Sequence, residues 1–269
     1  MENRLIQSFE QLNIDTTKPL GLIFDIDELL YNNSAEISLA YRTLLDDRAI
    51  SALPGENFAG SDLFDIVRRL KQKYHLKESL DELVEERRRR YIELLSSSKG
   101  ECLPGVKELF CFIHANRDNL DIRVAYASSS EKAFVDIILR NVFLACGLPQ
   151  FAENPETFFY GGLDHPASMC WQKGLEKKPS PMLYNHTIQK LGLPVSQCLA
   201  FEDSKSGFQA ARKAGLNVVV IPSAANQKAF EHLDDNVFNS DGVCKLTCIS
   251  DFISILEVIK GQKISTVYP

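Results

Sequence analysis

Short runs of apolar residues alternate with longer amphipathic stretches along most of the chain. Residues 20–24 read as a buried strand that ends abruptly at Asp25-Ile26-Asp27-Glu28. Similar runs predict strands at 122–127, 199–201 and 218–221, and 157–160 is a weaker candidate. Parallel strands need crossover connections, so strands alternating with helices predict a doubly wound parallel α/β sheet with helices on both faces. Ligands bind such sheets at the carboxyl ends of the strands.

The amphipathic stretches between these runs have recognisable helix ends. Ser180-Pro181 is typical of an N-cap followed by a first-turn proline, and Gly192 is a typical stop. Gly215 is expected to end the next helix in the same way. These boundaries place the predicted helices between the predicted strands.

Residues 34–102 break the alternation because they contain several helical patterns and no convincing strand. Ser79, with Glu82 three residues later, predicts a capping box. This segment is therefore predicted to be an all-helical cap domain inserted into a core formed by residues 1–33 and 103–269, with Leu103-Pro104-Gly105 as a hinge. The charged run 85–90 favours a solvated helix face over a phosphate-binding patch, since Glu85–Arg89 and Glu86–Arg90 are favourable helical pairs.

Composition narrows the classes of partner. The chain has 269 residues, and its net charge of −6 argues against nucleic acid as the main partner. No stretch approaches the roughly 18 apolar residues of a membrane span, and the first residues lack a signal-peptide pattern, so no membrane association and a cytoplasmic location are expected. Seven scattered cysteines, an odd number, indicate a reducing compartment. The oligomeric state is left open.

The first candidate chemistry is the acid pair that follows residues 20–24. At the end of a strand, one of Asp25 and Asp27 could attack phosphorus while the other handles a proton. Acid pairs after strands are common, so a loop or helix cap is an equal alternative for this pair taken alone.

Three further elements follow other apolar runs or precede helices. Ser128 and Ser129, in Ser128-Ser129-Ser130, could hold phosphate oxygens with the nearby backbone N–H groups, or could cap a helix. Lys178 could neutralise a phosphoryl group, although a lone lysine is usually solvated. Glu202-Asp203 suits magnesium, with a helix cap by Asp203 or Ser204 as the alternative. Four structural explanations at once, in this order, are improbable.

With these elements in this order, the chain resembles the haloacid-dehalogenase-like phosphatases. The resemblance rests on 22–27 (LIFDID), 127–130 (ASSS), 178–181 (KPSP) and 198–211 (CLAFEDSKSGFQAA), of which the last is highly specific. It covers about residues 20–259 and points to the branch with β-phosphoglucomutase, phosphoglycolate phosphatase and sugar-bisphosphate phosphatases, which have a Rossmann-like core and a helical cap.

The resemblance implies a role for each matched residue. Asp25 would be the nucleophile, and Asp27 would protonate the leaving oxygen and later deprotonate water. Ser128, Ser129 and Lys178 would bind the phosphoryl group. Mg²⁺ would be held by the Asp25 side chain, the Asp27 backbone carbonyl and Asp203, with Glu202 as a further acid. The expected function is magnesium-dependent hydrolysis of small phosphorylated metabolites, such as sugar phosphates, through an aspartyl-phosphate.

Departures from the family pattern leave alternatives open. Glu28 and Leu29 stand where relatives have Gly and then Thr or Val, so the turn is either conventional or strained, and a catalytically impaired binding protein is one alternative. Ile37 replaces a histidine typical of mutases, which favours hydrolysis over a phosphomutase. Residues 58–62 lack the basic residue expected for a second phosphate. His165, in the loop 161–165, could contact substrate or be an ordinary surface residue.

Overall fold

The computed structural model describes residues 12, 14–15, 17–51, 63–98, 101–158, 168–171, 176–223, 226–227, 230 and 241–259. The chain divides into two compact units. One contains residues 1–31 and 101–269, and the other contains residues 32–100. These limits lie within two residues of the domain boundaries expected from the sequence.

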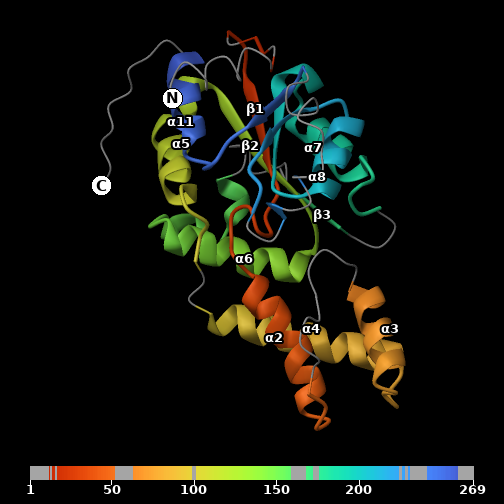
Figure 1. Cartoon of the computed structure of the whole chain (residues 1–269). Coiled ribbons are helices and arrows are strands. Elements are labelled where there is room, and N and C mark those ends of the chain that lie inside the picture. The colour runs from red at the N-terminus through yellow and green to blue at the C-terminus, as the bar shows by residue number, and fades with distance from the viewer. Residues whose placement is uncertain are drawn as a thin grey trace. The chain divides into compact units, whose positions relative to one another are not determined.

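The larger unit is built on one six-stranded sheet in the order β3-β2-β1-β4-β5-β6, and every neighbouring pair is parallel (Figure 1). The central strand β1 is buried along its whole length and pairs with β2 on one side and β4 on the other. The predicted doubly wound α/β fold is therefore confirmed. The strands are β1 (Leu20–Phe24), β2 (Ile122–Glu131), β3 (Ser168–Trp171), β4 (Cys198–Glu202), β5 (Asn217–Val220) and β6 (Val243–Lys245).

Helices cover both faces of this sheet (Figure 1). On one face the core is aromatic, because Phe110 lies 5.7 Å from Phe24 and 5.8 Å from Phe143 between ring centroids. Ring pairs at this spacing add to the stability gained from apolar burial. The helices are α5 (Val106–Leu120), α6 (Lys132–Ala145), α7 (Met182–Leu191), α8 (Lys205–Lys213) and α11 (Asp251–Ile259), with 3₁₀ turns η1 (Pro149–Phe151), η2 (Pro155–Thr157) and η3 (Val195–Gln197).

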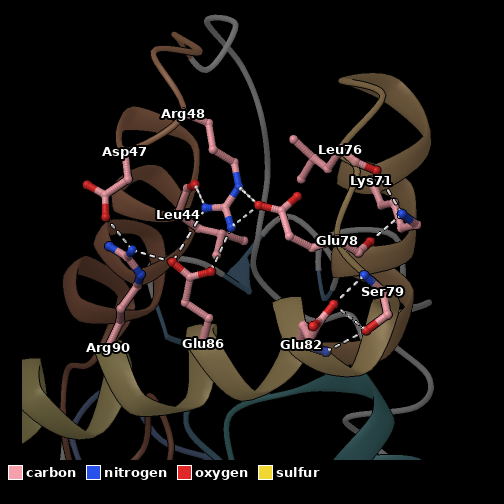
Figure 2. Close-up of polar contacts among 10 residues, drawn as sticks. All are labelled: Leu44, Asp47, Arg48, Lys71, Leu76, Glu78, Ser79, Glu82, Glu86 and Arg90. Carbon is pink, nitrogen blue, oxygen red and sulfur yellow. Dashed lines mark hydrogen bonds and ion pairs between the residues drawn. The ribbon is translucent and has the colours of Figure 1, made fainter.

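The smaller unit is helical throughout its described part: α2 (Ser34–Asp46), α3 (Leu63–Lys73) and α4 (Leu80–Ser97). Its core is an apolar cluster to which all three helices contribute, including Leu44, Val67 and Leu83. Ser79 caps α4 and forms the predicted capping box with Glu82, as Figure 2 shows.

Arg48 and Glu86 centre a charge network on the helical unit (Figure 2). Arg48 donates to Glu78 at 2.8 Å and to Glu86 at 2.7 Å. Arg90 contacts both Glu86 and Asp47 at 2.5 Å. The predicted Glu86–Arg90 pair is confirmed. The solvated-face prediction is wrong for Arg87, which is 4 % exposed and lies against the rings of Tyr41 and Tyr91.

Several predicted boundaries were wrong in detail. The candidate strand at 157–160 begins inside the 3₁₀ turn η2, while the sheet gains β3 and β6, which are too short to show a clear pattern. Strand β2 continues through Ser128–Ser130 to Glu131, so these serines do not open the following helix. Pro181, and not Ser180, is the N-cap of α7, whose end at Gly192 is confirmed by a left-handed φ of 63°.

None of the helices in the described part of the chain is long and apolar enough to cross a membrane. The six described cysteines are free thiols.

Candidate active site

The site lies where β1 and β4 end side by side. Phe24 and Phe201 are register partners, and the amide of Asp25 donates to the carbonyl of Phe201 at 3.0 Å. Glu202 is the last residue of β4 and Asp203 follows it. Parallel pairing therefore brings three acids that are distant in sequence to the same edge of the sheet.

Lys178, which lies just before α7, bridges two of these acids. Its Nζ lies 2.5 Å from Oδ1 of Asp25 and 2.6 Å from Oε1 of Glu202, and the lysine side chain is only 4 % exposed. The ammonium also lies 5.1 Å from the ring centroid of Tyr184, whose hydroxyl donates to the same Oε1 of Glu202. The null interpretation of Lys178 as a solvated lysine is excluded by this burial.

The buried charges at this edge do not balance. Burial raises the pKa of Asp25 well above its ordinary value, despite the attraction of Lys178. Burial, and then the charge of Glu202, raise the pKa of Asp203 to about 7. Burial lowers the pKa of Lys178, but the carboxylates of Asp25 and Glu202 outweigh it and raise that pKa overall. One ammonium thus faces three carboxyl groups.

A divalent cation fits this surplus of acid. Asp25, Glu202 and Asp203 are all buried, and each offers a carboxylate oxygen within 4.8 Å of the others'. Magnesium prefers such hard oxygen ligands. A cation there would also relieve the repulsion that raises the pKa values of Asp25 and Asp203. The residues present therefore fit the metal that the sequence predicts.

Asp27 has a different environment from Asp25. It is half-buried, and its Oδ2 accepts from the hydroxyls of Ser130 at 2.7 Å and Ser128 at 3.2 Å. The hydroxyl of Ser129 points elsewhere and accepts from the backbone N–H of Lys178 at 3.2 Å. The two acids of the Asp-x-Asp motif are thus held separately, Asp25 by an ammonium and Asp27 by hydroxyls.

Two backbone features next to the acids are unusual. Glu28 has a φ of +60°, so the strained alternative is the one found at this turn, at a cost of about 1–3 kcal/mol. Gly207 packs against Glu202 so closely that a Cβ there would lie 2.1 Å from Cδ of that acid. A side chain at position 207 would therefore displace the Glu202 carboxylate.

The structural alternative for Glu202-Asp203-Ser204 is resolved by the start of α8. Ser204 is the N-cap, and its hydroxyl accepts from the amide of Gly207 at 3.1 Å. Since Ser204 caps the helix, Asp203 is available for another role.

The structure brings together four of the seven predicted site residues, Asp25, Lys178, Glu202 and Asp203, and links Asp27 with Ser128. Ser129 contacts the backbone of Lys178. Sequence reasoning missed Tyr184, Ser130, Ser223 and Asn226, whose contacts depend on tertiary structure. The predicted substrate-reading residues 58–62 and the loop 161–165, with His165, lie outside the described residues.

Comparisons with known proteins agree with this geometry. Residues 20–215 match the family model "haloacid dehalogenase-like hydrolase". Protein CbbY of Rhodobacter capsulatus is 36% identical over 134 residues, which is 50% of this chain and 51% of CbbY. The phosphorylated carbohydrates phosphatase of Thermotoga maritima is 26% identical over 226 residues, covering 78% of this chain and 88% of that protein. The alignment with CbbY thus spans about half of that relative.

Solved structures share the fold. The crystal structure of CbbY from Rhodobacter sphaeroides in complex with phosphate gives a TM-score of 0.65 at 20% identity, and covers 87% of this chain and 96% of that one. A β-phosphoglucomutase from Clostridium difficile is also among the similar structures. The predicted superfamily, branch and enzyme class are confirmed by these matches.

Proposed function

Because this chain belongs to the haloacid dehalogenase-like hydrolase family, we propose that it hydrolyses phosphate monoesters of small metabolites, sugar phosphates among them, through an aspartyl-phosphate on Asp25. The observation that supports this most is the buried contact of Asp25 with Lys178 at 2.5 Å, beside a second acid, Asp27, with its own hydroxyl donors. A carboxylate and a separate proton donor are the two groups that ester hydrolysis through a covalent intermediate requires.

The proposed reaction has two steps. In the first, a carboxylate oxygen of Asp25 bonds to phosphorus, the P–O bond to the alcohol breaks, and Asp27 gives its proton to the departing oxygen. In the second, Asp27 takes a proton from water, whose oxygen bonds to phosphorus as the bond to Asp25 breaks, which releases inorganic phosphate. General acid and base help of this kind is worth about 10²–10⁴ in rate.

The other residues supply charge and position. Lys178 would neutralise phosphoryl oxygens as well as Asp25, and Glu202 holds the ammonium at 2.6 Å from its own carboxylate. Ser128 and Ser129 would bind the phosphoryl group. Asp25, Asp203 and the Asp27 carbonyl would hold Mg²⁺, with Glu202 as a further acid. The cation would add electrostatic stabilisation of the phosphoryl charge.

The proposed partner is a small phosphorylated metabolite and not nucleic acid, in keeping with the net charge of −6. We place the protein in the cytoplasm because its cysteines follow no disulfide pattern. The helical unit is proposed to act as a cap that closes over the bound substrate and excludes water.

The test is a phosphate-release screen over a broad panel of phosphate esters, with and without Mg²⁺. Asp25→Asn serves as the blank, and Asp136→Asn, which removes an exposed carboxylate paired with Lys132, is the matched control. We expect magnesium-stimulated release by the parent and the control, and loss of at least about 1,000-fold in Asp25→Asn.

Other outcomes of the screen separate the alternatives. Isomerised sugar phosphate without free phosphate would identify a phosphomutase. Binding of Mg²⁺ without turnover of any ester would identify an impaired binding protein, for which the strained Glu28 is the structural argument. Equal rates for the parent and Asp25→Asn would show that Asp25 is not the nucleophile.

A further inference from the structure

The neighbouring acids Glu202 and Asp203 are held in different ways. The carboxylate of Glu202 is tied to charged and polar groups of the site, with Lys178 at 2.6 Å and the hydroxyl of Tyr184 on the same oxygen. Asp203 is held from the opposite direction by neutral groups that follow β5. Nδ2 of Asn226 donates to its Oδ2 at 2.7 Å, and Ser223 is also hydrogen-bonded to it.

Asn226 is itself fixed by a turn. Its backbone N–H donates to the carbonyl of Ser223 at 3.0 Å, and its Nδ2 also reaches the Ser223 hydroxyl at 3.2 Å. The turn is anchored to the site by the amide of Ile221, which donates to the carbonyl of Glu202 at 2.8 Å. The side-chain amide is therefore presented to Asp203 by backbone that continues directly from the sheet.

Asp203 is 1 % exposed and offers one oxygen to the acid cluster with Asp25 and Glu202. Its carboxylate can turn about its terminal torsion, which has broad and shallow preferences in a free side chain. A hydrogen bond to one oxygen removes that freedom and fixes the direction of the other. An amide suits this task because it donates without adding charge, whereas an acid at position 226 would repel Asp203.

We propose that Asn226, held by Ser223, is a positioning residue that ties down Oδ2 of Asp203 and so orients Oδ1 toward a divalent cation shared with Asp25. The inference rests on the proposed function, since that function supplies the cation. Partners that hydrogen-bond to metal-ligating carboxylates typically contribute about 10–100-fold to metal affinity. Asn226 therefore contributes to cation binding without touching the cation.

The test is direct binding of Mn²⁺, as a probe for Mg²⁺, to the full chain without substrate, measured by the electron paramagnetic resonance signal of free Mn²⁺. Asn226→Ala is compared with Asp203→Asn and with a matched control, Asn217→Ala. Asn217 lies at the opposite end of β5, and its Nδ2 donates to the carbonyl of Leu12 at 2.6 Å. The control thus loses a similar amide hydrogen bond away from the acids.

We expect Asn226→Ala to weaken Mn²⁺ binding by about tenfold, Asp203→Asn to weaken it more, and Asn217→Ala to leave it within about twofold of the parent. Asn226→Ser, which keeps a shorter donor, should fall between the parent and Asn226→Ala, and it provides the measurement if the alanine variant does not fold. A change of less than about threefold in Asn226→Ala, or an equal loss in Asn217→Ala, would overturn the proposal.

The result can be separated from the fate of the proposed function, because it needs no turnover. A chain that hydrolyses esters with Mg²⁺ but binds Mn²⁺ independently of Asn226 refutes only this inference. A chain that hydrolyses nothing, yet binds Mn²⁺ with the expected dependence on Asn226, refutes only the function.

Discussion

Acids are treated in opposite ways in the two units of the chain. In the helical unit, Glu78 and Glu86 share the guanidinium of Arg48, and Glu86 also meets Arg90, so acids and bases balance. Hydrogen bonding to Arg48 lowers the pKa of Glu86. At the sheet edge, Asp25, Glu202 and Asp203 share one lysine, and burial raises the pKa values of both aspartates.

The comparison shows which charges support the fold and which cost stability. Balanced pairs near the surface stabilise the helical unit modestly. Buried acids in excess are expensive, and such cost is concentrated at functional sites. The sheet edge is therefore a site preorganised for a cation and a phosphoryl group, while the network of Figure 2 is structural.

The largest expected difference between the units is in the removal of a base. Lys178→Met should lower the free energy of unfolding by about 3–5 kcal/mol at pH 8, because it leaves Asp25 and Glu202 buried without their cation. Arg48→Met should cost only about 1 kcal/mol, since its partners can turn to water. Denaturant unfolding measures both. Equal costs for the two variants would contradict the comparison.

The next difference is in the sign of the pH dependence. The pKa of Asp203 is about 7 in the folded chain and near 3.8 when unfolded, so its ionisation destabilises the metal-free fold increasingly as pH rises from about 4 to 7. Glu86 has a lowered pKa, so its contribution is present above about 4.5 and is lost as pH falls further.

Unfolding of the chain in a chelating buffer across this range tests the signs. Asp203→Asn should reduce the fall in stability between pH 4 and 7, whereas Glu86→Gln should lower stability mainly above pH 4.5 and leave that fall unchanged. An unchanged slope in Asp203→Asn would show that its carboxyl does not titrate as the structure indicates.

A smaller effect is expected from crowding the site. Gly207→Ala places a Cβ within 1.8 Å of Oε2 of Glu202, so the acid or α8 must move, at a cost of about 1–3 kcal/mol and with reduced turnover. Gly147→Ala is the control for backbone strain, because Gly147 also borders a helix, has a φ of +74° and has open space around its Cβ position. A stable Gly207→Ala chain with parental turnover would show that the position of Glu202 is unimportant.

The smallest effect concerns the turn after Asp27. Glu28→Gly should relieve the left-handed strain at φ +60°, partly offset by the higher entropy of glycine in the unfolded chain, for a net gain of up to about 1 kcal/mol. Thermal unfolding of the two chains measures it. A loss of stability would mean that contacts of the Glu28 side chain outweigh the strain.

Much of the site could be predicted because its residues follow strands with clear apolar patterns. The ends of β1 and β4 place Asp25, Glu202 and Asp203 at one edge, and sheet geometry does the rest. Tyr184 and Asn226 could not be predicted, because each joins the site through the packing of an element with no motif of its own. Glu28 left two backbone conformations open, and only the structure distinguishes them.

The sheet was predictable to the same extent. Strand β1 was predicted with its exact limits, while β3 and β6, of four and three residues, are too short for a pattern to emerge. Serines in β2 resemble a helix start in sequence, yet pairing with β3 extends the strand through them, since Ser128 is in register with Cys170.

The central claim is that the carboxylate of Asp25 forms a covalent bond to phosphorus. The most direct measurement is acid quenching of the enzyme during turnover of a hydrolysed ester with Mg²⁺, followed by mass spectrometry of its peptides. The account predicts a phosphoryl group on the peptide that contains Asp25, and its absence in Asp25→Asn. Phosphate on another residue, or ongoing turnover with an unmodified Asp25 peptide at every quench time, would contradict it.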